Sequence, residues 1–599
     1  MNKEQEAAAY SNTKRVAVVA GPGSGKTTTL VQAVARRCRE SGPQSVICIT
    51  FTVAGAREME KRLAALPPEQ GGPIRGLGFC GTLHSFLLRL ARRMHASLGL
   101  SSGVGVVDEE VAAELLGEVA LEMGSKAAKK RLEELAGRAD LARHGVLGTR
   151  PIAISREELA VVEFHRRLAR EGLLTIDALL AIGHHLVQKC AKERMAIGEA
   201  DWWPWRHLFW DEFQDSGDLD LAIMEAMPVQ TKFIVGDPDQ SIFGFRGARP
   251  GNFINIVDEP NIPAQVATWE KHCLETNYRS DADICLAAQL LVQRNQNRVQ
   301  KDTLPRPGAD SGKVEVYNTE VPAVEAAKVV EIVNDFIHYR CEDAGPDMEV
   351  EYQNCLKEAA VLARTNRHAR ELACALKAAG IPVHEAVREE EPKDWRTAKL
   401  IVAALAAPGS SIAWLSLARA LGGKAEAEKA KVNATMGMCS VREALAKTGS
   451  RRWASPSLLS LQSKLGFEAA DRLGRCVAAV TDAEGRLDYG ELMAAMSAGE
   501  QQEKEQRGVY VGTAHSAKGR EWDFVVVCGL EEGTFPSAKA KTDEEVEEER
   551  RLCFVAMTRA RHELHLTLCK GRPQSRGPNL PPGPLLPKQP SRFIKEAGL

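Results

Sequence analysis

Residues 20–27 read Ala-Gly-Pro-Gly-Ser-Gly-Lys-Thr, and this octet separates two different hydrophobic patterns. The apolar run 16–19 before it predicts a buried strand, and the pattern that begins at Thr28 predicts a helix. A strand, a glycine-rich turn and a helix N-terminus together form a phosphate-binding loop, because backbone N–H groups curl around the phosphates and the helix dipole favours their charge. The octet therefore predicts an α/β fold that binds a nucleoside triphosphate.

The octet also predicts which side chains hold the nucleotide. Lys26 is expected to reach the β- and γ-phosphates, and the Thr27 hydroxyl is expected to ligate Mg²⁺. The usual pattern begins with glycine where this chain has Ala20. A glycine-rich loop without a ligand is the alternative, and the flanking strand and helix patterns argue against it. The predicted cofactor-binding residues of this segment are Ala20, Gly21, Pro22, Gly23, Ser24, Gly25, Lys26, Thr27 and Thr28.

A second apolar run, 208–210, ends in the acidic pair Asp211 and Glu212. A buried parallel strand that delivers two carboxylates at its C-terminal end suits an ATPase. We expect Asp211 to hold Mg²⁺ and Glu212 to orient and polarise the attacking water. Acidic pairs also begin many helices, so the pair alone is ambiguous. Together with the octet, it predicts hydrolysis.

Length and composition restrict the class of protein. The chain of 599 residues is long enough for several domains, and its net charge of −2 argues against a purely electrostatic nucleic-acid binder but not against a local basic groove. We find no apolar stretch of about 18 residues and no signal-peptide pattern, so we expect no membrane contact. The 14 cysteines form no Cys-x-x-Cys pair. We expect reduced cysteines in a cytoplasmic protein, and a cluster built from distant cysteines stays an open alternative.

Apolar runs alternate with helical patterns in two regions, which predicts two α/β cores, each split by a mostly helical insertion. The first core is expected at 1–90 and 200–272, around an insertion at 91–199. The second is expected at 273–384 and 505–599, around an insertion at 385–504. The last thirty residues, proline-rich at 581–584, are expected to form a loose tail. The predicted strands are 16–19, 46–51, 208–210, 233–235, 314–317, 359–363, 509–513, 524–527 and 564–568.

Further short motifs follow one another along the chain. They are Asn2-x-x-Gln5, Thr50-Phe51-Thr52, Gly81-Thr82-Leu83-His84, Asp211-Glu212-Phe213-Gln214-Asp215, Gly236-Asp237-Pro238-Asp239-Gln240, Asn277-Tyr278-Arg279-Ser280, Thr513-Ala514-His515-Ser516-Ala517-Lys518 and Val555-Ala556-Met557-Thr558-Arg559. In this order they resemble the motifs of superfamily 1A DNA helicases of the UvrD/PcrA/Rep type. The resemblance covers nearly the whole chain, although the two insertions match only in position and length. It implies two RecA-like P-loop NTPase cores (1A and 2A) with insertions 1B and 2B.

The resemblance also implies roles at the nucleotide. Gln5 would read the adenine, Tyr278 would offer it a flat face, and Glu521 would lie at the cofactor. Gln240 would sense the γ-phosphate. The catalytic set would then be Lys26, Asp211, Glu212, Gln240, Arg279 and Arg559.

The two arginines of this set lie in the second core, so they can act only when the cores close on the nucleotide. Arg561 lies two residues from Arg559, and the resemblance favours Arg559. A surface ion pair is the usual role of a lone arginine, and the placement of Arg279 and Arg559 within motifs argues against it.

Single-stranded DNA would bind along aromatic faces and phosphate donors. For Phe51 and Phe243, core packing is the alternative, and for the Trp202-Trp203-x-Trp205 cluster packing is preferred over base stacking. The run 543–549 is expected to be a solvated helix face rather than a metal site. The expected DNA-binding residues are Phe51, Thr52, His84, Phe243, Phe245, Arg246, Arg364, Asn366, His515 and Lys518.

The chain departs from the family pattern in two motifs. Val53 and Ala54 stand where the family has Asn-Lys, and Arg520 stands where it has Leu. The first departure removes a polar and a charged side chain near the expected strand path.

The sequence thus predicts an ATP- and Mg²⁺-dependent motor that moves on single-stranded DNA and unwinds duplexes, with 3′→5′ polarity taken only from the resemblance. The alternative is an ATP-gated DNA-binding effector that needs a partner and does not unwind alone. Expected partners are single-stranded DNA, junctions of single- and double-stranded DNA, and a protein bound through either insertion. The expected location is the cytoplasm, in association with the nucleoid.

Overall fold

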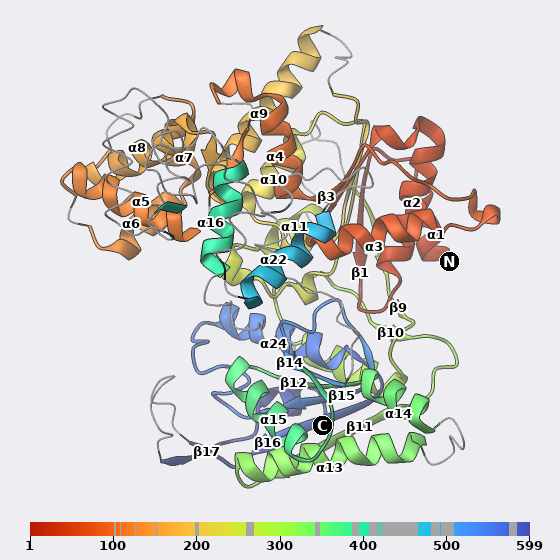
Figure 1. Cartoon of the computed structure of the whole chain (residues 1–599). Coiled ribbons are helices and arrows are strands. Elements are labelled where there is room, and N and C mark those ends of the chain that lie inside the picture. Colours follow the sequence, from red (N-terminus) through yellow and green to blue (C-terminus); the bar gives the residue numbers. More distant parts are fainter. Residues whose placement is uncertain are drawn as a thin grey trace.

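The computed structural model contains two lobes, each built around a parallel sheet covered by helices (Figure 1). It describes residues 1–100, 103–107, 109–125, 127–149, 151, 154–197, 203–258, 269–341, 348–385, 395–406, 417–418, 421, 465, 467–480, 492, 508–573 and 584–599. The two sheets confirm the expected α/β cores.

The first sheet has the strand order β3-β2-β6-β7-β1-β8, and all of its pairings are parallel. Its strands are β1 (Arg15–Ala20), β2 (Val46–Thr50), β3 (Phe79–Thr82), β6 (His207–Trp210), β7 (Thr231–Gly236) and β8 (Glu270–Leu274). Its helices include α1 (Lys3–Ala9), α2 (Lys26–Ser41), α3 (Val53–Ala64), α10 (Asp218–Ala226) and α11 (Pro250–Asp258). The central strands are continuous apolar runs because helices cover both faces of a parallel sheet.

Sequence patterns predicted four of these six strands. β3 escaped because it is short and contains Gly81, and β8 escaped because it reads Glu-Lys-His-Cys-Leu. An edge strand has one side open to water, so it needs no apolar run. β8 crosses position 272 and pairs with β1, so this strand of the first sheet extends past the predicted domain boundary.

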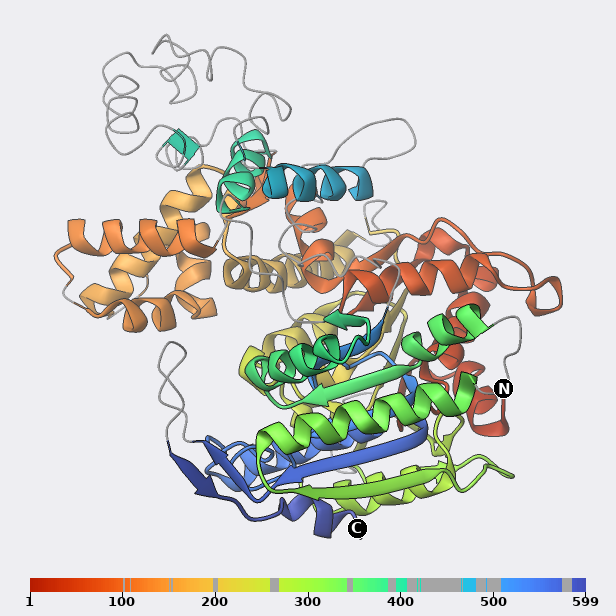
Figure 2. The ribbon, with the colours of Figure 1, turned by 60° about the horizontal axis from the view of Figure 1, so that its bottom comes forward.

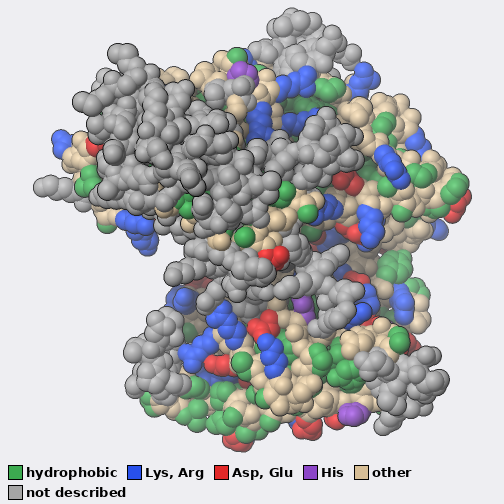
Figure 3. Space-filling model, viewed as in Figure 1, with side chains coloured by type: hydrophobic (Ala, Val, Ile, Leu, Met, Phe, Trp, Pro, Cys, Tyr) green, Lys and Arg blue, Asp and Glu red, His purple; other side chains and the backbone are tan. Residues whose placement is uncertain are grey.

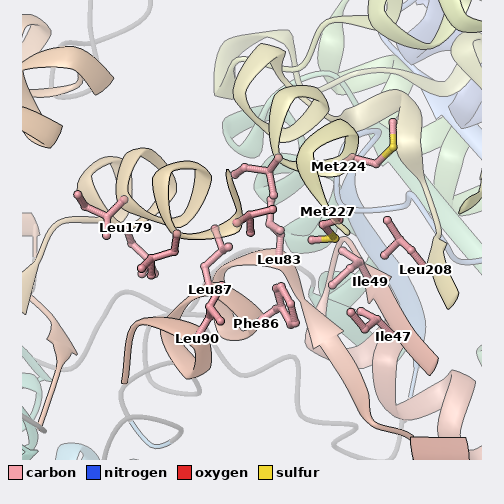
Figure 4. Close-up of a cluster of buried hydrophobic side chains, with 14 of the residues drawn as sticks. Ile47, Ile49, Leu83, Phe86, Leu87, Leu90, Leu179, Leu208, Met224 and Met227 are labelled. Atoms are coloured by element: carbon pink, nitrogen blue, oxygen red, sulfur yellow. The ribbon is translucent and has the colours of Figure 1, made fainter. Parts of the chain in front are cut away.

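The first insertion is helical and is anchored on the first core. α4 (Leu83–Arg93) leads into it from the first core, and its own helices are α5 (Glu109–Glu122), α6 (Lys129–Ala136), α7 (Ala139–Val146), α8 (Arg156–Arg170) and α9 (Ile176–Ile197). Figure 4 shows Leu83, Phe86, Leu87 and Leu90 of α4 pointing into one interior with Ile47 and Ile49 of β2. A Cβ at Gly183 of α9 would lie 2.6 Å from Leu87, so glycine permits this close packing. Two short strands, β4 (Gly105–Val106) and β5 (Leu173–Leu174), also pair here, where no strand was expected.

The tryptophans before β6 are packing residues, as preferred from the sequence. Trp203 and Trp205 are buried, and their rings lie 6.2 and 5.3 Å from the Phe86 ring. Trp202 lies outside the described residues.

The second sheet has the order β11-β16-β15-β12-β14-β13, again all parallel. Its strands are β11 (Lys313–Thr319), β12 (Ala359–Ala363), β13 (Val383–Glu385), β14 (Val509–Thr513), β15 (Trp522–Cys528) and β16 (Ala560–Cys569). Its helices include α12 (Ala282–Val292), α13 (Pro322–Cys341), α14 (Met348–Lys357), α15 (Asn366–Ala378) and α24 (Asp543–Met557). Figure 2 shows α13 lying across the sheet beside β11 and β16. The edge strand β13 is the strand of this sheet that the sequence patterns missed.

The expectation of a loose C-terminal tail is wrong. β17 (Gly571–Pro573) pairs with β18 (Leu585–Pro587), and α25 (Arg592–Glu596) follows. Phe593 is 1% exposed and its ring lies 6.2 Å from that of Phe535 in the second core. The sequence pattern missed α25 because its apolar residues are few and follow a proline-rich stretch. Their packing partner, Phe535, is distant in the sequence.

Within the second predicted insertion, the structure describes two helices, α16 (Trp395–Ala406) and α22 (Phe467–Val480). Leu400 and Ile401 of α16 pack into the hydrophobic cluster of the first insertion. Most of the remaining positions of this predicted insertion lie outside the described residues.

On the face shown in Figure 3, basic and acidic side chains are interspersed, in keeping with the net charge of −2. No helix among the described residues is both long and apolar enough to cross a membrane.

Candidate nucleotide and DNA site

The glycine-rich octet forms the turn between β1 and α2. Gly23 and Gly25 have φ values of 64° and 82°, a conformation that favours glycine. α2 begins at Lys26, and its N-cap Gly25 has no side chain to cap the first N–H groups. Lys26 Nζ lies 3.5 Å from the carbonyl oxygen of Ala20. Uncapped N–H groups beside an ammonium fit a chain of phosphates.

Residues from two segments, 2–5 and 277–279, surround this turn. A Cβ at Gly23 would lie 2.6 Å from both Arg279 Cβ and Asn277 Oδ1. Gln5 Nε2 donates to the carbonyl oxygen of Ser24 at 2.9 Å. Asn2 Nδ2 donates to the Tyr278 hydroxyl at 3.0 Å, and Tyr278 is 44% exposed. The two residues expected at the adenine therefore lie beside the octet.

The acidic pair lies at the end of β6. Asp211 N–H donates to the carbonyl of Ile49 at 2.9 Å, which continues the β2–β6 pairing. Glu212 has a φ of 53° and is the only non-glycine residue with positive φ in the described part of the chain. Such a backbone costs on the order of 1–3 kcal/mol and is typical of functional sites.

The two carboxyl groups differ in how readily they ionise. Burial and the neighbouring Glu212 raise the pKa of Asp211 to about 7. Burial opposes ionisation of Glu212, but Lys26 and Lys518 outweigh it and lower the pKa of Glu212. A bound cation offsets the repulsion between buried carboxylates that lie close together. Asp211 and Thr27 thus fit Mg²⁺, which takes one or two protein carboxylates together with substrate phosphates.

Gln214 connects the acidic pair to the next loop, a role that the sequence did not reveal. Its Oε1 accepts the Asp237 N–H at 2.9 Å, and its Nε2 donates to Glu212. Asp237 in turn accepts from Gln240 Nε2. Hydrogen bonds therefore link Glu212, Gln214, Asp237 and Gln240 in the first core, through both the backbone N–H and the carboxylate of Asp237.

The two cores meet at Gln240. Arg559 of the second core is 1% exposed, and its Nη2 donates to Gln240 Oε1 at 3.3 Å. Burial, and then Arg279, lower the pKa of Arg559 to about 9. Arg279 Nη1 donates to the Thr558 carbonyl at 3.3 Å, and its Nε donates to Glu521. Arg561 points elsewhere, to Glu521 and Asp523.

Lys518, expected at DNA, lies between the cores. Its Nζ donates to the carbonyl of Gln240 at 2.9 Å and to the Asp215 carboxylate. It also lies 4.9 Å from the centre of the Phe243 ring. Lys518 therefore contacts both the nucleotide-side loop and an aromatic residue of the expected DNA path.

Four rings form a row that runs from one core to the other. Phe51 and Phe243 stack with centroids 5.0 Å apart at 17°, Phe245 lies 6.0 Å from Phe243, and His515 of the second core lies 5.8 Å from Phe245. Phe245 is 69% exposed, and the Arg246 guanidinium lies over both neighbouring rings at 5.5 and 5.7 Å. Burial, and then Arg364, lower the pKa of His515 to about 4, so its ring is neutral near pH 7. We call these four rings the aromatic row.

Three other expected DNA-binding residues lie at the starts of helices. Thr52 caps α3, His84 is exposed in the first turn of α4, and Asn366 is exposed at the start of α15. Arg364 Nε instead pairs with both oxygens of Glu549 at 2.9 and 3.0 Å. Glu549 is 8% exposed, so the expectation that 543–549 is a fully solvated face is wrong at its last residue.

The sequence of the chain matches the models of two known domain families. Residues 1–261 match the model of the UvrD/REP helicase N-terminal domain, and residues 272–389 and 484–571 match that of the UvrD-like helicase C-terminal domain. The chain belongs to the UvrD/PcrA/Rep family of superfamily 1 helicases. The protein is a DNA helicase with ATPase activity. Its two parallel sheets are the RecA-like cores of the family.

Curated relatives of this helicase carry the name ATP-dependent DNA helicase PcrA. The protein from Leuconostoc citreum is 26% identical over 676 residues, which cover 100% of this chain and 84% of the relative. Those from Staphylococcus epidermidis RP62A and Staphylococcus aureus Mu50 are 25% and 26% identical, over 100% of this chain and 86% of each relative. ATP use and binding of single-stranded and duplex DNA follow from membership of the family.

The departures of this helicase from the family pattern have defined positions. Val53 is the first residue of α3 and is 40% exposed next to Thr52. The Arg520 guanidinium lies 4.9 Å from the centre of the buried Tyr510 ring, and its carbonyl accepts from Arg559 Nη1 at 3.1 Å. Arg520 is thus a neighbour of the inter-core arginine.

Proposed function

We propose that this helicase moves 3′→5′ along single-stranded DNA and unwinds duplexes by ATP-driven closing and opening of its two cores. The observation that carries the proposal is the contact between Arg559 and Gln240. Gln240 begins the loop that also contains Phe243 and Phe245, so one loop touches the nucleotide side and the aromatic row. The direction of movement is proposed on the family resemblance.

At the nucleotide, each side chain has a task that suits its surroundings. The uncapped N–H groups of α2 and the Lys26 ammonium would bind the phosphates. Thr27 and Asp211 would hold Mg²⁺, which neutralises phosphate charge when bound. Glu212 is held by Gln214 and is the more acidic carboxyl group of the pair, so it would orient a water molecule as hydrogen-bond acceptor.

Closure of the cores would bring two arginine side chains to the γ-phosphate. Arg559 belongs to the second core, and Arg279 donates to the Thr558 carbonyl of that core, so both would stabilise charge that develops at the γ-phosphate. Neither guanidinium can do so when the cores are apart. Hydrolysis is thereby tied to a movement of one core against the other, which is the requirement for a motor.

DNA would lie along the aromatic row. Stacking of bases on such rings is worth about 1–3 kcal/mol per base and is tolerant of sequence. The row contains side chains of both cores, so a bound strand would be gripped by parts that move relative to each other. A protein bound through 1B or 2B would add to this grip at a junction.

An effector that needs a protein partner and does not unwind alone is the second candidate. The exposed Val53 beside Thr52 favours it, because a valine cannot pair with a phosphate where the family has polar and charged side chains. This departure weakens the expected hold on the strand at the start of the aromatic row.

Strand displacement separates the two candidates. A duplex with a 3′ tail and one with a 5′ tail are each incubated with ATP and Mg²⁺, with Lys26→Ala as the control. Unwinding of the 3′-tailed duplex alone supports the autonomous motor. ATPase activity stimulated by single strands without unwinding of either duplex supports the effector.

A further inference from the structure

Glu548 of the second core contacts the first-core loop that contains Phe243 and Phe245. Its Oε1 accepts the backbone N–H of Gly244 at 3.0 Å. Gly244 lies between Phe243 and Phe245 of the aromatic row. The acceptor is a carboxylate on α24, more than 300 positions away in the chain.

The contact caps a small, self-contained turn. Gly244–Arg246 is a 3₁₀ turn in which Arg246 N donates to the Phe243 carbonyl at 2.8 Å and Gly247 N donates to the Gly244 carbonyl at 2.9 Å. The first N–H of the turn is satisfied from the other core. A charged acceptor at the first N–H of a helical turn both caps it and complements its dipole.

The same helix also carries the contact at the nucleotide. α24 ends at Met557, two residues before Arg559, which donates to Gln240. Residues 549–557 of α24 are buried, so the helix is held along most of its length. The ten residues from Glu548 to the end of α24 span about 15 Å. The second core therefore contacts this first-core loop at two points. Glu548 of α24 contacts Gly244, and Arg559, just after α24, contacts Gln240.

We propose that Glu548 is a positioning residue that fixes the 243–246 turn, and with it the aromatic row, only when the cores are closed. The inference rests on the DNA path proposed above. Separation of the cores withdraws the carboxylate from the Gly244 N–H and leaves the turn attached to the first core alone. An open pocket of about 320 Å³ lies beside the turn, with Ser241, Gly244 and Glu548 among its lining residues.

The absence of a side chain at Gly244 allows the Glu548 carboxylate to approach. A Cβ there would lie 2.5 Å from Glu548 Oε2 and 2.9 Å from Oε1. A side chain at 244 would therefore push the carboxylate off the N–H. The conformation of Gly244 itself does not demand glycine, since its φ is not in the left-handed region. Glycine is needed here for the approach of Glu548.

The test measures how strongly nucleotide changes the affinity for DNA. The dissociation constant for a fluorescent oligo(dT) is determined with and without a non-hydrolysable ATP analogue and Mg²⁺, and the ratio of the two constants is compared among variants. Glu548→Ala should move this ratio toward one by about tenfold, because a hydrogen bond to a charged group is lost. Glu548→Gln should keep most of the ratio, since an amide oxygen still accepts. Glu544→Ala, in the exposed first turn of α24, should behave as the parent.

A double-mutant cycle isolates the contact from effects on folding. Gly244→Ala should reduce the ratio as Glu548→Ala does, and the double variant should be no worse than either single one, because both changes remove the same bond. Additive losses would overturn the proposal. So would a parental ratio in folded Glu548→Ala protein while Phe245→Ala still weakens DNA binding. Unchanged DNA binding in Phe245→Ala would instead contradict the proposed DNA path.

Discussion

Arg559 donates to the side-chain oxygen of Gln240 across 3.3 Å, and the two residues belong to different cores. Arg559 is almost fully buried, and its other nitrogens donate to the carbonyls of Val555 and Arg520. The guanidinium is thus already oriented toward the first core. Among the described residues no carboxylate forms an ion pair with this buried charge, which suits a site where phosphate charge is to be met.

Arg559→Ala should lower kcat for ATP at saturating single-stranded DNA by about 10³-fold or more, because an arginine that acts across such a cleft is worth 10³–10⁵ in rate. Arg561→Ala is the matched control. Its guanidinium forms half-exposed ion pairs with Glu521 and Asp523, so its loss should change kcat only slightly. Equal losses in the two variants would refute the assignment of Arg559.

Lys26→Ala should abolish ATP turnover and leave the fold intact. Among the described contacts, the Lys26 ammonium makes a hydrogen bond to the Ala20 carbonyl at 3.5 Å, which is too long to contribute much stability. Steady-state ATPase rates and thermal unfolding, with exposed Lys14→Ala as the control, give the comparison. Normal turnover in Lys26→Ala would contradict the phosphate-binding role of the octet.

Phe245→Ala should weaken binding to oligo(dT) by about 1–3 kcal/mol, with a larger effect on DNA-stimulated than on basal ATPase activity. Its ring is 69% exposed, so the melting temperature should hardly change. The control Phe253→Ala removes a buried ring of the first core and should cost about 3–5 kcal/mol of stability. A comparable loss of stability in Phe245→Ala would show that this ring packs rather than binds.

His165 in the first insertion should make the protein sensitive to acid. Its Nε2 pairs with the Ala136 carbonyl at 3.1 Å, and burial lowers its pKa to about 4, against about 6.5 in an unfolded chain. Between these values the unfolded chain binds a proton that the folded chain does not. The free energy of unfolding therefore falls as the pH drops below about 6.5, and the loss is complete near pH 4.

His165→Gln keeps a donor for the Ala136 carbonyl but does not titrate. Thermal midpoints at pH 8 and pH 5 should fall less in this variant than in the parent. His207, whose pKa burial also lowers to about 4, is unchanged in both proteins and contributes equally. An equal fall in the two proteins would show that His165 does not carry the effect.

Several parts of the fold could be predicted because their signals are local. Buried parallel strands such as β1 and β15 contain apolar runs, 16–20 and 524–528, since both faces are covered. Edge strands are not, and β8 and β13 escaped for that reason. The packing of Phe593 on Phe535 escaped because the two rings are far apart in sequence.

The candidate site divides in the same way. Residue types and the flanking hydrophobic patterns indicated the octet and the acidic pair. They did not identify Gln214 as the link between Glu212 and Asp237, because a glutamine within a motif has many uses. Arg364 matched the residue type of a phosphate contact, but the buried Glu549 of α24 lies beside it and pairs with it.

The sequence by itself determined that this chain has two α/β cores and a glycine-rich turn between a strand and a helix, and its motifs predicted which arginines act on the nucleotide. These features depend on residue order over short stretches, where backbone geometry and hydrogen-bonding type suffice. Only the tertiary structure decided what bridges the cores: Arg559 to Gln240, Lys518 to Asp215 and Glu548 to Gly244. Each of these contacts joins residues about 300 or more positions apart, so its formation depends on how two sheets are brought together and not on any pattern along the chain.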